Sequence, residues 1–150
     1  MELYPDFREF FESFNAHEVR YLVVGGYAVG FHGLPRYTGD IDTWVEPTPE
    51  NSRRTVAAMA DFGFVSPGLE PDAFAVENVV VQIGQSPLRI DVMTSPSGVA
   101  FGPCFEARLD VEADGVPIHV IGLDCLRANK AASGRPQDLA DLSRLSERGD

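Results

Sequence analysis

The strongest constraint on the fold is segment 25–46, GGYAVGFHGLPRYTGDIDTWVE, where a glycine pair ends an apolar run and two aspartates follow. Residues 40–45 alternate with a period of two, which is typical of a β-strand. Residues i and i+2 of a strand point to the same side, so the carboxylates of Asp40 and Asp42 are expected about 5–7 Å apart. Two carboxylates this close repel each other unless a proton or a cation lies between them.

A divalent cation is the simplest way to remove that repulsion. Mg²⁺ prefers oxygen ligands, keeps several waters and takes phosphate oxygens as further ligands. A third aspartate, Asp91, lies in a similar apolar run, LRIDVMT at 88–94. If the two strands are neighbours, Asp40, Asp42 and Asp91 form a cluster able to hold two metal ions during a phosphoryl or nucleotidyl transfer. We therefore predict Mg²⁺, or Mn²⁺, at these three aspartates.

The glycine pair, Gly25-Gly26, precedes a short segment with helical character. Glycines allow backbone N–H groups to approach a phosphate closely, and the start of a helix favours negative charge. Gly-Gly is common in turns, so only its combination with the aspartates indicates a phosphate site.

The remaining pattern predicts one α+β domain, residues 1–150, with a mixed sheet. Helices are expected at 6–16 with Asp6 as N-cap, at 27–33, from Thr48 or Glu50 to about Phe62, at 123–131, and from Pro136 to about Glu147. Strands are expected at 20–24, 40–45, 73–83 and 87–93, and a hairpin at 105–121 around Asp114-Gly115. The core would span about 20–93, followed by the hairpin and two helices at 105–147.

Charge and composition narrow the class of protein. A net charge of −11 argues against a general nucleic-acid binder, which needs clustered Lys and Arg. No apolar run approaches ~18 residues, so no membrane span is expected. The acidic first residues lack a signal-peptide layout, which predicts a cytoplasmic protein. Cys104 and Cys125 lack metal-ligand spacing and are expected to be free, buried thiols.

With these residues placed, the chain resembles the nucleotidyltransferase superfamily, which has the fold of DNA polymerase β. The pattern of that superfamily is a strand ending in Gly-Gly or Gly-Ser, a short helix, Asp-hydrophobic-Asp on a second strand, and a later carboxylate. Here Gly25-Gly26, Asp40-Ile41-Asp42 and Asp91 match it, over about residues 20–93. Within the superfamily, GGYAVGFHGLPRYTGDID and DCLRANKAASGRPQDLADL (124–142) look most like the small bacterial group that includes AbiEii/MenT-type toxins.

The resemblance implies roles for individual residues. Asp40 and Asp42 would bind metal and the phosphates of an NTP, and Asp91 would bind the second metal and act as, or assist, the general base. The glycine pair would seat the triphosphate. The side chains expected to neutralise or contact that triphosphate are Arg36, Thr38 and Lys130.

The implied activity is transfer of a nucleoside monophosphate from an NTP to a hydroxyl of a protein, an RNA 3′ end or a small molecule. The resemblance also implies a role in a toxin–antitoxin or phage-defence system. Many members have a serine after the first glycine, whereas Gly26 has no hydroxyl. Only two short helices follow the core, so a partner protein or a homodimer is expected to complete the pocket. Two alternatives stay open: a lincosamide-type antibiotic nucleotidyltransferase, and a binding or antitoxin module with this fold and no chemistry.

Overall fold

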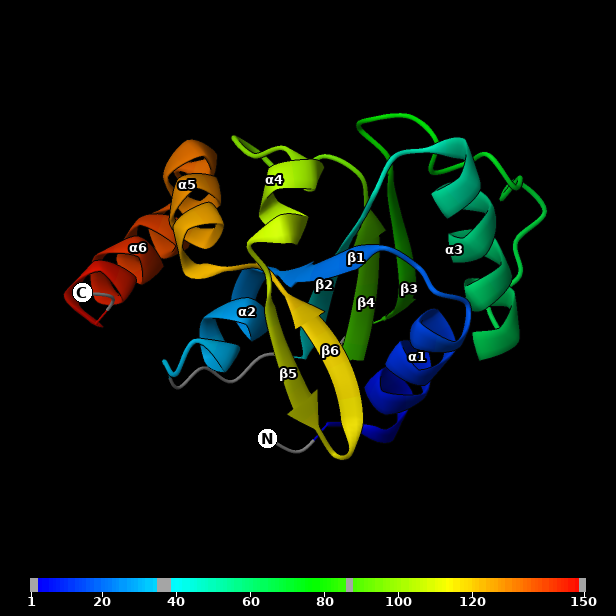
Figure 1. Cartoon of the computed structure of the whole chain (residues 1–150), viewed down its shortest axis with the longest axis horizontal. Helices are drawn as coiled ribbons and strands as arrows, with labels where there is room; N and C mark the ends of the chain where they lie inside the picture. The colour runs from blue at the N-terminus through cyan, green and yellow to red at the C-terminus, as the bar shows by residue number, and fades with distance from the viewer. Residues whose placement is uncertain (1–2, 35–38, 86–87, 149–150) are drawn as a thin grey trace.

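A computed structural model describes residues 3–34, 39–85 and 88–148, so the predicted phosphate ligands Arg36 and Thr38 lie outside the described residues. The strands form one mixed sheet in the order β3-β4-β2-β1-β6-β5 (Figure 1). They are β1 (Tyr21–Val24), β2 (Asp40–Val45), β3 (Val80–Gln85), β4 (Leu88–Met93), β5 (Leu109–Ala113) and β6 (Val116–Val120). The helices are α1 (Pro5–Ala16), α2 (Gly25–Phe31), α3 (Pro49–Phe62), α4 (Phe101–Glu106), α5 (Leu123–Ser133) and α6 (Pro136–Arg148). The predicted α+β class with a mixed sheet is confirmed.

Helix α1 supplies a large part of the core. Its buried face consists of four phenylalanines at helical spacing: Phe7, Phe10, Phe11 and Phe14. This face packs against α3 and β6, and α1 and α3 lie together at the right of Figure 1. The predicted N-cap, Asp6, is wrong, because Pro5 starts the helix and places Asp6 within the first turn.

Pairing at the centre of the sheet determines where the aspartates lie. Strand β2 runs antiparallel to β1 and parallel to β4. Asp42 is thereby the register partner of Val24 on one side and of Asp91 on the other. A parallel pair needs a long crossover, which α3 and β3 provide here.

Two elements differ most from the sequence prediction, and the helix expected at 27–33 begins earlier, at Gly25. The strand expected at 73–83 begins only at Val80, because residues 71–78 form turns and bends. The hairpin expected at 105–121 is shorter, because residues 101–106 form α4. The buried side chains of α4, including Phe101 and Phe105, recur at i and i+4, and the Phe101 ring packs edge-on against Trp44 with centroids 5.2 Å apart.

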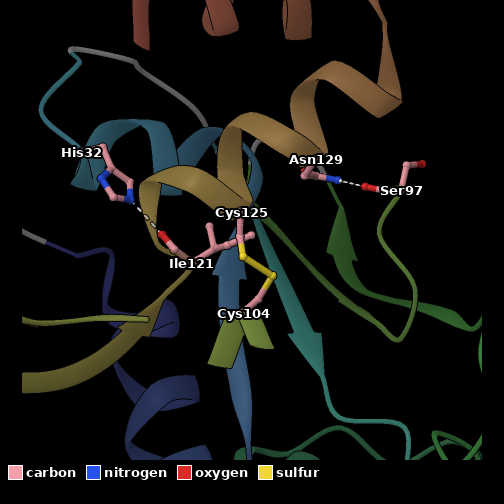
Figure 2. The surroundings of a disulfide bond; sticks show 6 residues. All are labelled: His32, Ser97, Cys104, Ile121, Cys125 and Asn129. Carbon is pink, nitrogen blue, oxygen red and sulfur yellow. Dashed lines mark hydrogen bonds between the residues drawn. A yellow bond between two sulfur atoms is a disulfide. The ribbon is translucent and has the colours of Figure 1, made fainter. Parts of the chain in front are cut away.

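Helix α4 also overturns the prediction of free thiols. Cys104 of α4 and Cys125 in the first turn of α5 form a disulfide, with their Cα atoms 5.9 Å apart (Figure 2). The β5–β6 hairpin lies between the two cysteines in sequence and returns the chain to the end of the sheet where α4 lies. Their separation of 21 residues therefore becomes a short distance in space.

Within the described ranges, no helix is both long and apolar enough to cross a lipid bilayer.

Candidate active site

Four charged side chains from two neighbouring strands share one face of the sheet. Strand β2 contributes Asp40 and Asp42, and β4 contributes Arg89 and Asp91. The register pairs Asp40 with Arg89 and Asp42 with Asp91. Because direct cross-strand partners point to the same side, the four groups converge. β2 and β4 are thus neighbours, as the predicted carboxylate cluster requires. We call Asp40, Asp42, Arg89 and Asp91 the aspartate face.

Asp42 is a carboxyl whose pKa is raised by its surroundings in the aspartate face. The pKa of Asp42 is raised to about 6, mainly by burial and then by the charges of Asp91 and Asp40. A hydrogen-bond contact with the Asp91 carboxyl acts in the same direction, whereas Arg89 lowers the pKa. Raising the pKa means that the folded protein disfavours the charged form of Asp42. This carboxyl is the group whose repulsion an added cation would relieve most.

Arg89 was not predicted as a site residue, although it contacts two of the three aspartates. Its Nη2 lies 3.4 Å from Oδ2 of Asp40, and its Nε lies 3.1 Å from Oδ1 of Asp91. The sequence does carry a signal for Arg89. Arg89 and Asp91 are at positions i and i+2 of one strand, so their side chains share a face.

Gly25 brings the backbone directly against the aspartate face. Its φ is +70°, in the left-handed region that glycine adopts without strain. A Cβ atom at this position would overlap Oδ2 of Asp42. A residue with a side chain would therefore displace the carboxylate, so the glycine is required both for the turn and for the close approach.

The aspartate face opens into a cleft of about 610 Å³. This volume is in the range of small-molecule and cofactor sites. The sheet side of the cleft is formed by Val24, Gly25, Gly26, Asp40, Asp42, Val80, Arg89, Asp91 and Met93. The other lining residues come from the loop after β4 and from the α5–α6 pair: Ser95, Pro96, Ser97, Asn129, Lys130, Ser133, Arg135, Pro136, Gln137 and Asp138. The predicted residues Gly25, Gly26, Lys130 and the three aspartates thus border one cleft.

Lys130 borders the cleft but is committed to two partners. Its Nζ donates to Oδ1 of Asp138 and Oδ2 of Asp141, both at 3.0 Å, and all three side chains are buried. Burial alone would raise the pKa of Asp138, but hydrogen bonds from Arg135, Ser133 and Lys130 outweigh burial and hold it well below its ordinary value. We call Lys130, Asp138 and Asp141 the lysine cluster; it joins α5 to α6.

Arg135 extends from the α5–α6 turn, and its side chain is 75% exposed. Its Nε donates to Oδ2 of Asp138 at 2.7 Å, which raises the pKa of the guanidinium, with a smaller contribution from Asp42. The effect of Asp42 places Arg135 within electrostatic reach of the aspartate face. Arg135 lies in the 124–142 motif, whose basic residues Arg127, Lys130 and Arg135 the sequence suggests as a phosphate-facing rim.

Contacts around the disulfide fix α5 beside the sheet (Figure 2). Nδ2 of Asn129 donates to the carbonyl oxygen of Ser97 at 2.9 Å, which connects α5 to the loop after β4. The Nε2 atom of His32 lies 2.8 Å from the carbonyl oxygen of Ile121, which connects the end of α2 to the segment that leads into α5. Together with the disulfide, these contacts hold the α5 side of the cleft in place.

The described ranges contain no group of three or more His, Cys, Asp or Glu side chains arranged to hold a metal ion. The predicted cluster is interrupted because Arg89 lies against Asp40 and Asp91. Oδ1 of Asp91 is nevertheless buried without a hydrogen-bond partner, with Arg89 Nε 3.1 Å away, and Asp42 is the register partner of Asp91. A carboxylate oxygen of this kind suits a hard cation. The residues present therefore fit a divalent ion at Asp42 and Asp91, and metal binding stays a prediction.

No protein-family model and no curated protein matches the chain. Among solved structures, the chain is similar to the 1.87 Å crystal structure of a protein from Thermotoga maritima described as a "putative nucleotidyltransferase". The two share 15% sequence identity with a TM-score of 0.65, and the similarity covers 95% of this chain and 91% of that one. At this identity the comparison supports the architecture: the chain has a nucleotidyltransferase-like fold.

Proposed function

We propose that the chain is a nucleotidyltransferase that moves a nucleoside monophosphate from an NTP to an acceptor hydroxyl. The observation that carries this proposal is the juxtaposition of Asp42 and Asp91 beside Gly25, at a cleft of nucleotide-binding size in a fold of this type. Asp40 and Arg89 complete the charged face.

In this proposal the triphosphate lies between the glycine pair and the α5–α6 turn. Gly25 and Gly26 offer a surface without side chains, against which phosphates can approach the backbone. Arg135 faces them from the other side and offsets their charge. Lys130 acts mainly through the lysine cluster, which holds Arg135 and Ser133 in position through Asp138. Arg36 and Thr38 stay proposed phosphate contacts.

The reaction is an in-line displacement. The acceptor oxygen forms a bond to the α-phosphorus, the bond to the α,β-bridging oxygen breaks, and pyrophosphate leaves. The hydroxyl proton passes to a carboxylate, for which Asp91 is the proposed base. Mg²⁺ or Mn²⁺, when bound, would polarise the phosphate and stabilise the attacking and leaving oxygens. Asp40, Asp42 and Asp91 are the proposed ligands.

The direct test is calorimetric titration of the protein with ATP, CTP, GTP and UTP in the presence of Mg²⁺. We expect at least one NTP to bind, and we expect the Asp40→Ala/Asp42→Ala variant to lose that binding. The matched control is Asp124→Asn, because the Asp124 side chain is fully exposed and outside the cleft. Equal binding by the wild type and the double variant would reject the site.

A finer proposal concerns the biological setting. The 25–42 and 124–142 segments support an AbiEii/MenT-like toxin acting in the cytoplasm, with a partner protein or a second copy that helps to form the acceptor side. Expression in bacteria should then arrest growth, and Asp42→Asn should relieve the arrest. Normal growth with folded, abundant wild-type protein would reject the toxin role and leave the enzymatic proposal to the titration.

A further inference from the structure

The disulfide between Cys104 and Cys125 joins two helices that are attached to the molecule in different ways (Figure 2). Helix α4 is anchored on the sheet, because its Phe101 ring packs against the buried ring of Trp44. Trp44 and Asp42 are at positions i and i+2 of β2, so α4 lies on the side of the sheet that carries the aspartate face. Cys104 therefore belongs to a part of the molecule that the core holds in place.

Helix α5 packs mainly on α6, to which the lysine cluster joins it. Beyond α6, its contacts include the disulfide in its first turn, the Asn129 hydrogen bond to the loop after β4, and the close approach of Ala132 to Gly98 in that loop. The disulfide is the covalent contact among these. Since Asn129, Lys130 and Ser133 of α5 line the cleft, the disulfide ties a wall of the cleft to the anchored helix α4.

The disulfide is open to a thiol from one side. Cys104 is 3% exposed, whereas Cys125 is half-buried, so access favours attack on the Cys125 sulfur. A thiolate forms a new S–S bond there, the Cys104–Cys125 bond breaks, and the Cys104 sulfur leaves and takes up a proton. A second thiolate then displaces Cys125, which is also protonated. In total, the protein disulfide is reduced to two thiols, and two reagent thiols are oxidised to one disulfide.

Two further features favour a bond that is opened and closed. Cys125 lies in the first turn of α5, and the start of a helix stabilises a thiolate, which favours the reduced form. In the cytoplasmic setting proposed above, thiols are mostly kept reduced, and a disulfide that forms there is usually catalytic or redox-sensing. A disulfide at the wall of the cleft, outside the proposed chemistry, fits the sensing use.

We propose that the Cys104–Cys125 disulfide is a redox-controlled clamp on the α5 wall of the cleft. The oxidised form holds α5 where the triphosphate is proposed to bind, and reduction by a cellular thiol releases the start of the helix and weakens NTP binding. The effect on NTP rests on the proposed function, whereas the release of α5 rests on the disulfide alone.

The first measurement needs no substitution and no nucleotide. The chain has only these two cysteines, so a reductant acts on the protein at this bond alone. The wild type is prepared with oxidised glutathione and with dithiothreitol, and thiol titration and the intact mass confirm each state. Hydrogen exchange followed by mass spectrometry should be faster at 123–133 in the reduced protein. Exchange in α1 should be the same in both states and is the internal control.

The second measurement is calorimetric titration of both states with the NTP that binds in the test above. We expect the reduced protein to bind about tenfold more weakly, within the usual range for coupling between two sites. Because such coupling is reciprocal, bound NTP should raise the equilibrium constant for disulfide formation against glutathione by the same factor. The Cys104→Ala/Cys125→Ala variant should bind as the reduced wild type does and should not respond to dithiothreitol.

Three results would overturn the clamp: no disulfide formed against oxidised glutathione, equal exchange at 123–133 in the two states, or equal NTP affinity in the two states. Folding of the double variant is checked by near-ultraviolet circular dichroism, and the wild-type comparison carries the test if the variant does not fold. If no NTP binds in either state but exchange at 123–133 differs, the proposed function fails and the redox-controlled release of α5 stands.

Discussion

The lysine cluster and the aspartate face border the same cleft, but they differ in how their charges are matched. In the lysine cluster, Lys130 lies between two buried carboxylates, each of which also receives a hydrogen bond from a further side chain. In the aspartate face, one guanidinium contacts two of the three carboxylates, and Asp91 keeps a buried oxygen without a hydrogen bond.

The difference in charge matching indicates that the buried charges of the lysine cluster are structural and that those of the aspartate face are functional. Buried ions are tolerated when their partners are complete, because removing charge from water is costly. The lysine cluster meets that condition without a ligand and joins two helices. The aspartate face does not meet it, and a protein that keeps such a face within a cleft is expected to complete it with a ligand.

The largest effect is expected from breaking the complete cluster. Lys130→Met leaves Asp138 and Asp141 buried without their shared cation, which should lower the free energy of unfolding by about 3–5 kcal/mol. The control is Arg8→Met, whose half-exposed pair with Glu12 should contribute about 0–1 kcal/mol. Urea denaturation followed by circular dichroism measures both. Similar, small losses in the two variants would mean that the lysine cluster does not hold α5 to α6.

A smaller effect is expected from crowding the incomplete face. Gly25→Ala imposes a strained backbone and pushes the new Cβ against Asp42, which should lower the free energy of unfolding by about 2–3 kcal/mol. It should also abolish NTP binding. Gly102→Ala is the matched control, because nothing lies within 4 Å of a Cβ there. Unchanged NTP binding in a folded Gly25→Ala protein would contradict the assigned role of the glycine.

The two regions should respond to pH with opposite sign. The pKa of Asp42 is raised to about 6, so in metal-free buffer this group reduces stability as the pH rises from about 4 to above 6. Asp42→Asn should therefore be more stable than the wild type by up to about 3 kcal/mol at neutral pH, and the gain should vanish near pH 4. A gain that does not change with pH would contradict the assigned shift.

For Asp138 the lowered pKa has the reverse consequence. Its contribution to stability is present above the unfolded pKa of about 4 and is lost as the pH falls further. Asp138→Asn should therefore be less stable than the wild type at neutral pH, and the two should converge in acid. Urea midpoints measured across the acid range test both variants in one series.

The smallest effect is expected at the contact between α5 and the loop after β4. Asn129→Ala removes one hydrogen bond to the Ser97 carbonyl oxygen, which should lower the free energy of unfolding by about 1 kcal/mol. NTP binding should weaken only slightly, because the disulfide still holds α5. A loss as large as that of Lys130→Met would show that this contact, and not the lysine cluster, fixes the helix.

The sequence was sufficient where the structure follows local periodicity. Alternation in 40–45 placed Asp40 and Asp42 on one face, and the single carboxylate in the apolar run at 88–93 predicted that Asp91 would join them. The same alternation places Arg89 on the face of Asp91, once basic residues are considered as well as acidic ones.

Features that depend on tertiary packing were not accessible from local patterns. Helix α4 contains Gly102 and Pro103, which weaken a helical prediction, and without this helix the approach of Cys104 to Cys125 could not be foreseen. The partners of Lys130 lie 8 and 11 residues further along the chain, beyond the turn at Gly134. Sequence motifs marked this lysine but not what it binds.

The most direct test of the central claim is transfer of label from α-³²P-labelled NTPs, with Mg²⁺ and total cell extract as the source of acceptor. The account predicts a labelled species with the wild type and with Asp124→Asn, and none with Asp42→Asn or Asp91→Asn, all four proteins being folded. Labelling that persists in both cleft variants would contradict the claim that the aspartate face carries out the chemistry.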